Sequence, residues 1–447
     1  MTKVQRISHF ISKLSLWQLW LVAFAPKLIW WLAVVLFGDA SFTMYDSAQF
    51  QLLSENMLNH GEFSRSLEAP FFPDIARTPG YPLFLLPFVA SSAALSVIAL
   101  VQSMLAAFVP VMLFKAAKRL QLASAQFAFL ILALDISLLL FMPLILSDGL
   151  FLILLSFLIY QMTKEKHHWS SYLLDGILLG ALVLVRPIAM FLPLLFLLFL
   201  VAKPATRKGA LLLLLGCVLF PGGWAFRNYK HFNTATISSM SSNNLLLYNA
   251  ANVYANNEGI SFAKAQRTLA QEALEQFDWN NDKSASKKYI SYCQERAMEI
   301  ITSSPSVFIE QVGHSIAFYF FKPPRSYFDK VFELNYNYSP IDGLGAKGSL
   351  LSRLKTRLQP ASAFSLVLSL ISLVFNVLVF GLAVRGAFSL LKKHPQLALL
   401  LIGGALYFCF LSVFTATDAR FRLPAVPFLA LLAAAAPIRT RSTGSRR

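Results

Sequence analysis

The sequence predicts an all-α polytopic membrane protein with about ten transmembrane helices, and three observations support this fold class. Of the 447 residues, 56% are hydrophobic and only 14% are charged, with a mean hydropathy of +0.58. A soluble domain normally carries about 25% charged residues, so this composition excludes a soluble fold, a disordered chain and a disulfide-stapled scaffold. The apolar residues also gather in ten runs, and basic links recur after every second run.

The ten apolar runs are expected to be membrane spans. They cover residues 16–37, 93–114, 122–142, 145–162, 170–186, 187–201, 210–226, 361–384, 396–416 and 423–437. At about 20 residues per span, ten spans use about 200 residues, and more than half of the chain lies outside the hydrocarbon. That remainder is too long to serve only as connectors.

The first apolar run, Leu16–Phe37, is expected to be an uncleaved anchor. Lys3, Arg6 and Lys13 precede it as they would a signal peptide, but the run is too long and lacks a small-residue cleavage site. Lys27 falls in the middle of this run. A charge at that depth is expected to face the interior of the helix bundle, and snorkelling to the surface is the alternative.

Basic residues in the short links set the expected orientation. These residues are Lys115, Lys118, Arg119, Lys164, Lys166, Lys203, Arg207, Lys208, Arg385, Lys392 and Lys393, and the tail adds Arg439, Arg441, Arg446 and Arg447. By the positive-inside rule these links and both termini are cytoplasmic. The net charge of +17 is then explained by basic residues that set the orientation and meet anionic lipid headgroups. It does not indicate a nucleic-acid partner.

Two long segments, 38–92 and 227–360, are therefore expected outside the membrane. They divide the chain into an N-terminal transmembrane core (1–226) that contains the first external loop, a large external region (227–360), and C-terminal helices with a basic tail (361–447). Periodicity predicts helices at Ser47–Asn59 with a stop at Gly61, at Ser261–Phe277 and at Ser284–Thr302.

The run Val307–Phe321 is a borderline case. It has only about 15 residues and places Glu310, Gln311, His314 and Ser315 on one face, which favours a helix lying in the membrane interface. The charges of the links that flank this run do not exclude that it crosses the membrane. We therefore expect ten spans without this segment.

The candidate functional residues lie at the outer ends of the spans. Asp46 follows the first span and begins an interfacial helix, so it is either a helix cap with Gln49 or a general base. Arg77 lies in Asp74-Ile75-Ala76-Arg77-Thr78-Pro79-Gly80-Tyr81-Pro82, where the prolines and the glycine fix the backbone. A guanidinium held there suits a lipid phosphate, and an interfacial anchor formed with Tyr81 is the alternative.

Other candidates share the same expected side of the membrane. Asp148 begins the fourth span next to Ser147, as a second acid or as a cap. Arginines stand at further outer span ends, and several of them could converge on one anion. These arginines are Arg186, Arg227, Arg420 and Arg422, and the further candidates for lining a cavity are Tyr45, Tyr81, Asn228 and Lys27.

Metal and cofactor signals are weak. His60, His231 and His314 are external but lack ligand spacing, and the three cysteines form neither a zinc pattern nor a redox pair. No phosphate-binding loop, catalytic Ser-His-Asp order or HExxH motif is present. The sequence names no certain cofactor and leaves a divalent metal open.

The layout of these residues resembles the bacterial membrane glycosyltransferases of the GT-C superfamily. The Asp after the first span, the interfacial helix and "RTPGYPLFL" carry the resemblance, together with "LSDGLFLILLSFL", "VLVRP", "PGGWAFRNYKHFNTATIS", "NNLLLYNAANVYA" and "DARFRLPAVPFLALLA". The chain looks most like the protein O-mannosyltransferases and lipid A aminoarabinose transferases. The first loop departs from the mannosyltransferases, which carry an Asp-Glu pair where this chain has Asp46-Ser47.

This resemblance implies an inverting transferase in the bacterial inner membrane. It would move a sugar from a polyprenyl-phosphate donor to a hydroxyl of a lipid, glycan or protein on the outer face. By similarity, Asp46 would be the base, Asp148 a second acidic position, and Arg77 a phosphate ligand that Arg227, Arg420 or Arg422 assists. A polyprenyl-glycan transporter or flippase, and an O-antigen ligase or polymerase using a diphosphate donor, remain the alternatives.

Overall fold

The described part of the chain is helical throughout. The computed structural model describes residues 3–164, 168–201, 206–277, 284–332, 363–414 and 419–437. Within these ranges no strand occurs, and the only extended pairing is an isolated bridge between Ser64 and Pro73. The predicted all-α class is thus confirmed for the described residues.

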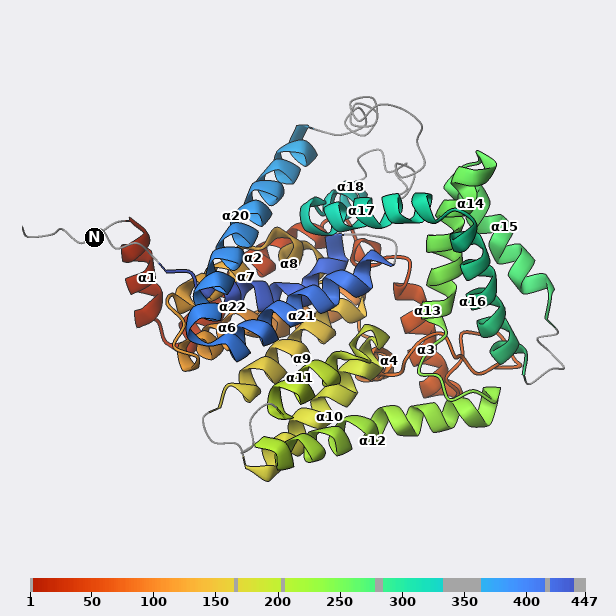
Figure 1. Cartoon of the computed structure of the whole chain (residues 1–447), viewed down its shortest axis with the longest axis horizontal. Coiled ribbons are helices and arrows are strands. Elements are labelled where there is room, and N and C mark those ends of the chain that lie inside the picture. Colours follow the sequence, from red (N-terminus) through yellow and green to blue (C-terminus); the bar gives the residue numbers. More distant parts are fainter. Residues whose placement is uncertain are drawn as a thin grey trace, which may run out of the picture.

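Five described stretches are long and apolar enough to cross a membrane. They are α2 (Leu16–Val35), α5 and α6 taken together (Leu95–Ala106 and Phe108–Arg119), α12 (Arg207–Phe232), α20 (Ala363–Lys393) and α21 (Pro395–Val413). Five shorter apolar stretches accompany them: α4 (Gly80–Ala90), α7 (Ala125–Leu134), α9 (Ser147–Met162), α10 (Trp169–Val185), and η2 with α11 (Pro187–Ala189 and Leu192–Val201). Figure 1 shows these apolar helices gathered in one body.

Local sequence explains where two of these helices stop. The apolar run 122–142 is divided at Asp135, whose Oδ1 accepts a hydrogen bond from the Leu138 backbone N–H at 3.1 Å. Asp135 thereby caps a second helix, α8 (Ile136–Phe141). The predicted stop after the interfacial helix is also confirmed, since α3 (Ser47–His60) ends at Gly61 with a left-handed backbone.

Helices α10 and α12 pack closely because both carry glycine on the shared face, and they run side by side in Figure 1. A Cβ added at Gly176 would collide with the Leu213 carbonyl, and one at Gly216 with the Leu173 carbonyl. Small residues at such positions let helix backbones approach, which strengthens van der Waals packing between apolar helices.

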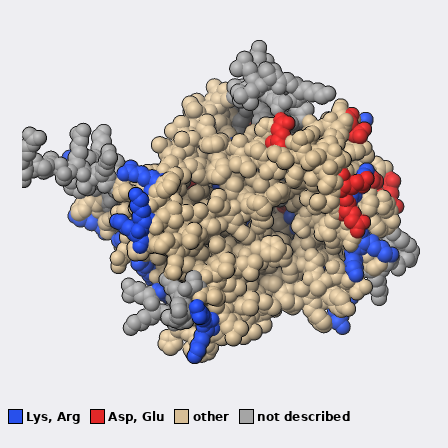
Figure 2. All heavy atoms as spheres, viewed as in Figure 1, with Lys and Arg blue, Asp and Glu red and all other residues tan. Residues whose placement is uncertain are grey.

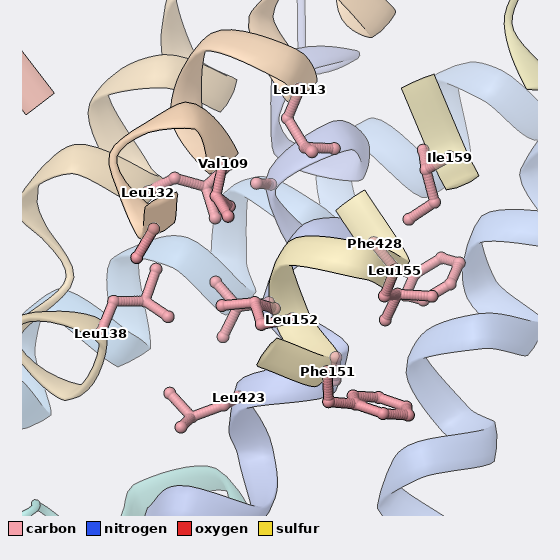
Figure 3. Packing of buried hydrophobic residues seen from close by; sticks show 14 of the residues in the cluster. Val109, Leu113, Leu132, Leu138, Phe151, Leu152, Leu155, Ile159, Leu423 and Phe428 are labelled. Carbon is pink, nitrogen blue, oxygen red and sulfur yellow. The ribbon is translucent and has the colours of Figure 1, made fainter. Parts of the chain in front are cut away.

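The main apolar core lies between α6, α7, α9 and α22 (Val426–Ala434). Figure 3 shows Leu152 of α9 surrounded by side chains of the neighbouring helices, with Val109 from α6 and Leu132 from α7 close by. The 3-10 segment η5 (Ala419–Ala425), which carries Arg420 and Arg422, adds Leu423 to this core.

A second, smaller core belongs to residues 227–360, the region that the sequence predicts to be external. It is built from η4 (Leu245–Ala250), α14 (Ala251–Glu258), α15 (Phe262–Glu275) and α16 (Ala285–Ser303). Two of these helices match predictions, because α15 and α16 fall on the two stretches that periodicity assigned. The short helix α13 (Met240–Asn244) leads into this unit from α12, and α17 (Pro305–Phe321) leads back to the apolar body.

Charged residues are distributed unequally between the two ends of the molecule. Figure 2 shows lysines and arginines without acidic residues over the end that holds α1 (Lys3–Lys13) and the start of α12, whereas acidic residues over α15 and α16 at the opposite end lie beside further lysines and arginines. Two of the long helices also end in basic residues, α6 in Lys118 and Arg119 and α20 in Lys392 and Lys393. This asymmetry follows the pattern of basic links in the sequence.

Candidate functional site

Asp46 stands between two short elements that follow α2. The chain leaves α2 at Val35, forms the 3-10 turn η1 (Asp39–Phe42), and enters α3 at Ser47. The Ser47 hydroxyl accepts the Met44 backbone N–H at 2.8 Å, whereas the Asp46 side chain makes no capping hydrogen bond. The alternative in which the Asp46 side chain caps this helix is therefore not supported, and its carboxylate is left for other partners.

Those partners are two arginines from distant parts of the chain. Nη2 of Arg77 donates to Oδ1 of Asp46 at 2.6 Å, and Nη2 of Arg420 donates to Oδ2 at 3.0 Å. The Asp46 side chain is 25% exposed, and both guanidiniums are less exposed than it is. One carboxylate is thus shared by two cations in a half-buried site, which we call the Asp46 cluster.

Helix α3 fixes the guanidinium of Arg77 from two sides. Its Nε donates to Oε1 of Gln49 at 3.0 Å, and its Cζ lies 5.1 Å from the ring centre of Phe50. Gln49 and Phe50 follow Asp46 by three and four residues, so all three share one helix face. The backbone N–H of Arg77 donates to Oδ1 of Asp74 at 2.7 Å, which fixes the turn that carries the arginine.

The segment after α12 holds that turn in place. The backbone N–H of Ser239 donates to the Ile75 carbonyl at 3.1 Å, and the Ser238 hydroxyl donates to the Ala76 carbonyl at 2.5 Å. The residues just before Arg77 are therefore bound to the large external region. This contact joins the two external segments that the sequence predicts separately.

Arg227 and Asn228 also belong to this support and do not reach Asp46. Arg227 donates to the Asp74 carbonyl at 2.7 Å and to Oδ1 of Asn228 at 2.8 Å. Its guanidinium lies against three aromatic rings, those of Phe63, Trp224 and Phe232. Asn228 is buried and donates to the Thr236 carbonyl at 2.7 Å. Arg227 thus binds the turn that carries Arg77, and Asn228 connects Arg227 to the Thr236 carbonyl.

The two arginines of η5 have different surroundings. Arg420 reaches Asp46, whereas Arg422 is 2% exposed and points into the protein. Nη1 of Arg422 donates to the carbonyls of Tyr319 at 2.8 Å and Phe320 at 3.0 Å, and its Nη2 donates to the Ser137 hydroxyl at 3.4 Å. The sequence suggests the same role for Arg420 and Arg422, but in the structure the two arginines have separate partners.

Asp148 forms a second, separate ion pair. Its carboxylate pairs with the guanidinium of Arg186, and both side chains are largely buried. Asp148 makes no cap at the start of α9, so that alternative is not supported. Tyr81 is buried nearby and donates to Oε1 of Gln102 at 2.7 Å, while Gln102 donates to the Leu144 carbonyl at 2.6 Å. Tyr81 and Gln102 thereby connect α4 and α5 to the segment that precedes α9.

The remaining two candidates differ in exposure. Tyr45 is 78% exposed, so it lies at the surface beside Asp46. Lys27 is 2% exposed, and its Nζ donates to the Ala23 carbonyl at 3.2 Å. The expectation that Lys27 faces the bundle interior is confirmed. It interacts electrostatically with Asp135, a residue that the sequence analysis passed over.

Two functional groups could have been found from the sequence but were not. Gln49 was considered only as part of a cap, although it follows Asp46 by three residues and holds Arg77. Asp135 interrupts an apolar run, and a carboxylate at such a place is a signal in itself. Its electrostatic partners are Arg422 and Lys27.

The electrostatics of the Asp46 cluster favour an anion. Burial raises the pKa of Asp46, but the guanidiniums of Arg420 and Arg77 outweigh this and lower the pKa from 3.8 to about 2. Two cations and one carboxylate leave a net charge of one positive unit, which suits a phosphate.

The donor set suits a divalent metal less well. Both oxygens of Asp46 are already bound by guanidiniums, and the described residues hold no grouping of three or more His, Cys, Asp or Glu that could bind a metal ion. Hard divalent cations require several oxygen ligands. The cluster therefore does not fit a metal, and no step is assigned to one.

Comparison with known proteins finds no matching family model and no matching curated protein. The function is accordingly inferred from the geometry of the Asp46 cluster and from the sequence resemblance.

Proposed function

We propose that this protein is an inverting membrane glycosyltransferase of the GT-C superfamily. It transfers a sugar from a polyprenyl-phosphate donor to a hydroxyl acceptor on the outer face of the bacterial inner membrane. The observation that carries the proposal is the single carboxylate of Asp46 held between Arg77 and Arg420. A base and two phosphate ligands are the groups that this reaction requires, and here they touch each other.

The chemistry follows from the competition between two anions for the same cations. The donor phosphate binds Arg77 and Arg420 and draws their guanidiniums from Asp46. The released carboxylate accepts the proton of the acceptor hydroxyl while the hydroxyl oxygen bonds to the anomeric carbon. The bond from that carbon to the phosphate oxygen breaks, and its electron pair stays on the phosphate, where the two arginines stabilise the charge.

The membrane arrangement belongs to the same proposal. The ten apolar runs predicted from the sequence, of which 423–437 is the last, cross the inner membrane, and α17 lies in the interface. Both termini are cytoplasmic, because the basic end of the molecule faces the inside under the positive-inside rule. The Asp46 cluster then lies at the outer surface, where α2 ends. The concentration of basic residues at one end in Figure 2 supports this orientation.

The large external region is proposed to select the acceptor. Ser238 and Ser239 of this region bind the Arg77 turn, and the separate core of η4, α14, α15 and α16 follows them in the chain. This region is attached to the turn that carries Arg77, the proposed phosphate-binding residue, and it extends away from the apolar body. It can therefore cover an acceptor bound at the Asp46 cluster. The acceptor class is a lipid, a glycan or a protein that offers a hydroxyl.

A transporter or flippase for a polyprenyl-linked glycan is the second candidate. One observation favours it, since Lys27, Asp135 and Arg422 are charged residues buried among apolar helices, as in many transporters. The contacts of Arg422 with the carbonyls of α17 favour a structural role instead. An O-antigen ligase or polymerase would share the external loop but would use a diphosphate donor.

The test uses the full-length protein in liposomes with polyprenyl-phosphate sugars. Wild-type protein is expected to transfer sugar to a hydroxyl acceptor. A second experiment identifies the acceptor, by mass spectrometry of envelope glycolipids and glycoproteins from cells with and without the gene. Asp46→Asn is expected to lower transfer by about 10²–10⁴-fold, the usual contribution of a general base. Glu68→Gln, at an exposed carboxylate of the same loop, should leave transfer unchanged.

Three outcomes would overturn the proposal. Full activity in Asp46→Asn excludes that residue as the base. Lipid translocation without sugar transfer supports the transporter. A strict requirement for a diphosphate donor supports the ligase.

A further inference from the structure

Arg422 is the largest fully buried side chain among the described residues. It donates from one nitrogen to the carbonyls of Tyr319 and Phe320, which belong to the last turn of α17. Carbonyls in the last turn of a helix lack intrahelical partners and carry the negative end of the helix dipole. A buried guanidinium is therefore well placed to bind them.

The same guanidinium faces a second negatively charged feature. Its other terminal nitrogen reaches the Ser137 hydroxyl at the start of α8, next to the buried carboxylate of Asp135, with which it interacts electrostatically. Lys27 of α2 interacts with that carboxylate as well. Arg422 thus joins η5 to α17 and α8, and the charge of Asp135 extends the connection to α2.

These contacts connect the two elements that carry the ion pair between Asp46 and Arg420. Helix α2 leads into the turn that carries Asp46, and η5 carries Arg420. A 3-10 segment makes one turn in three residues, so residues two apart point to different sides. When Arg422 is bound inside the protein, Arg420 is directed outward, toward Asp46.

We propose that Arg422 is a positioning residue, which acts through Arg420 and does not touch the donor phosphate. It fixes η5 against α17 and α8, and Asp135 is its counter-ion. The effect on catalysis rests on the function proposed above. The effect on the position of Arg420 does not, and it can be measured without any substrate.

The position is measured by cross-linking two introduced cysteines. The three native cysteines are replaced, and Asp46→Cys is combined with Arg420→Cys in the full-length protein in membranes. A short reagent that links two thiols should join the pair in high yield. Adding Arg422→Met is expected to lower this yield several-fold, because η5 loses its attachment to α17.

A matched pair controls for general unfolding. The control pair is Asp46→Cys with Arg77→Cys. Arg422 does not contact Arg77, so Arg422→Met should leave the cross-linking yield of this second pair unchanged. A fall in both yields indicates that the variant misfolds and overturns a specific positioning role. No fall in either yield overturns it equally.

The kinetic test uses variants that retain the native Asp46 and Arg420. Arg422→Met is expected to lower the kcat of transfer on the order of a hundredfold, the effect of a misplacement of about 1 Å. Arg422→Lys should recover part of this loss, since it restores the charge without the forked geometry. The triple variant with Lys27→Met, Asp135→Asn and Arg422→Met removes all three of the interacting buried charges, so it should recover thermal stability but not kcat.

The two proposals fail in different ways. If the wild-type protein transfers no sugar but Arg422→Met still lowers only the first cross-linking yield, the function is wrong and the positioning role stands. If the triple variant recovers full kcat, Arg422 only balances the charge of Asp135, and the positioning role is wrong.

Discussion

Asp46 and Arg420 are 374 positions apart in the sequence, yet Nη2 of Arg420 lies 3.0 Å from Oδ2 of Asp46. The second cation, Arg77, is 31 positions from Asp46 and reaches its other oxygen. The cluster therefore forms only when the last apolar helices pack against the first external loop. Long-range contacts of this kind are sensitive to the packing of every element between them.

The first prediction concerns the two arginines of the cluster. Arg77→Gln and Arg420→Gln should each raise the KM for the donor by roughly tenfold to a hundredfold, because a hydrogen bond to a charged group contributes about 1.5–3 kcal/mol. Steady-state transfer assays with a varied donor concentration measure this. Arg267→Gln, at an exposed arginine of α15, is the control, and an equal rise in that variant would refute specific phosphate binding.

The second prediction concerns pH. Asp46 acts as a base only when it is deprotonated, and its pKa of about 2 in the free protein places the loss of kcat/KM at very low pH. Arg420→Gln removes the stronger of the two lowering charges while burial, which raises the pKa, remains. The acid limb of kcat/KM should therefore move to higher pH in this variant. An unchanged limb would show that Arg420 does not act on Asp46.

The same shift has a consequence for stability. A carboxylate whose pKa is lower in the folded protein than in the unfolded chain stabilises the fold above its unfolded value of 3.8, and this contribution is lost as the pH falls toward about 2. Its size is about 2 kcal/mol. Asp46→Asn should flatten the acid side of the unfolding profile in detergent, whereas Glu68→Gln should leave it unchanged.

The third prediction concerns the buried pair of Asp148 and Arg186. Removing one partner leaves an unpaired buried charge, so Asp148→Asn or Arg186→Met should destabilise the protein by about 3–5 kcal/mol. The double variant Asp148→Leu with Arg186→Met should recover most of this loss, as thermal unfolding in detergent will show. If the stable double variant transfers sugar at the wild-type rate, Asp148 has no catalytic role.

The fourth prediction concerns helix packing. A Cβ added at Gly386 of α20 would collide with the Leu432 carbonyl of α22, whereas one at Gly381 on the same helix meets nothing within 4 Å. Gly386→Ala should lower stability by about 1–3 kcal/mol through overpacking. Gly381→Ala should be neutral or slightly stabilising. Equal effects at both positions would mean that α20 and α22 do not pack as described.

The sequence was most informative where a local pattern sets the structure. Apolar runs predict the helices, because burial of a continuous apolar surface does not depend on which neighbour covers it. The end of α3 at Gly61 and the extents of α15 and α16 also follow from nearby residues. The short apolar helix α4 was missed, since the prolines and glycine at its start indicated a turn.

The sequence was less informative about side-chain partners. Asp46 and Gln49 fit a capping box by spacing, but two distant guanidiniums compete for the carboxylate and prevail. Asp148 fits a cap in the same way, and Arg186 pairs with it instead. A charged partner in a half-buried site binds a carboxylate more strongly than a backbone N–H, and spacing alone does not reveal such a partner.

By itself, the sequence determined that the chain is helical and apolar, and it placed Asp46 and Arg77 in one segment, residues 38–92, between two apolar runs. Only the tertiary structure decided which other arginine joins them. Arg227 is bound by aromatic rings and Arg422 by the carbonyls of α17, so Arg420 alone of these three reaches Asp46 among the contacts described. The physical reason is that the end of a helix, which local sequence sets, fixes only the backbone position of an arginine. The packing of other helices decides where its long side chain places the guanidinium.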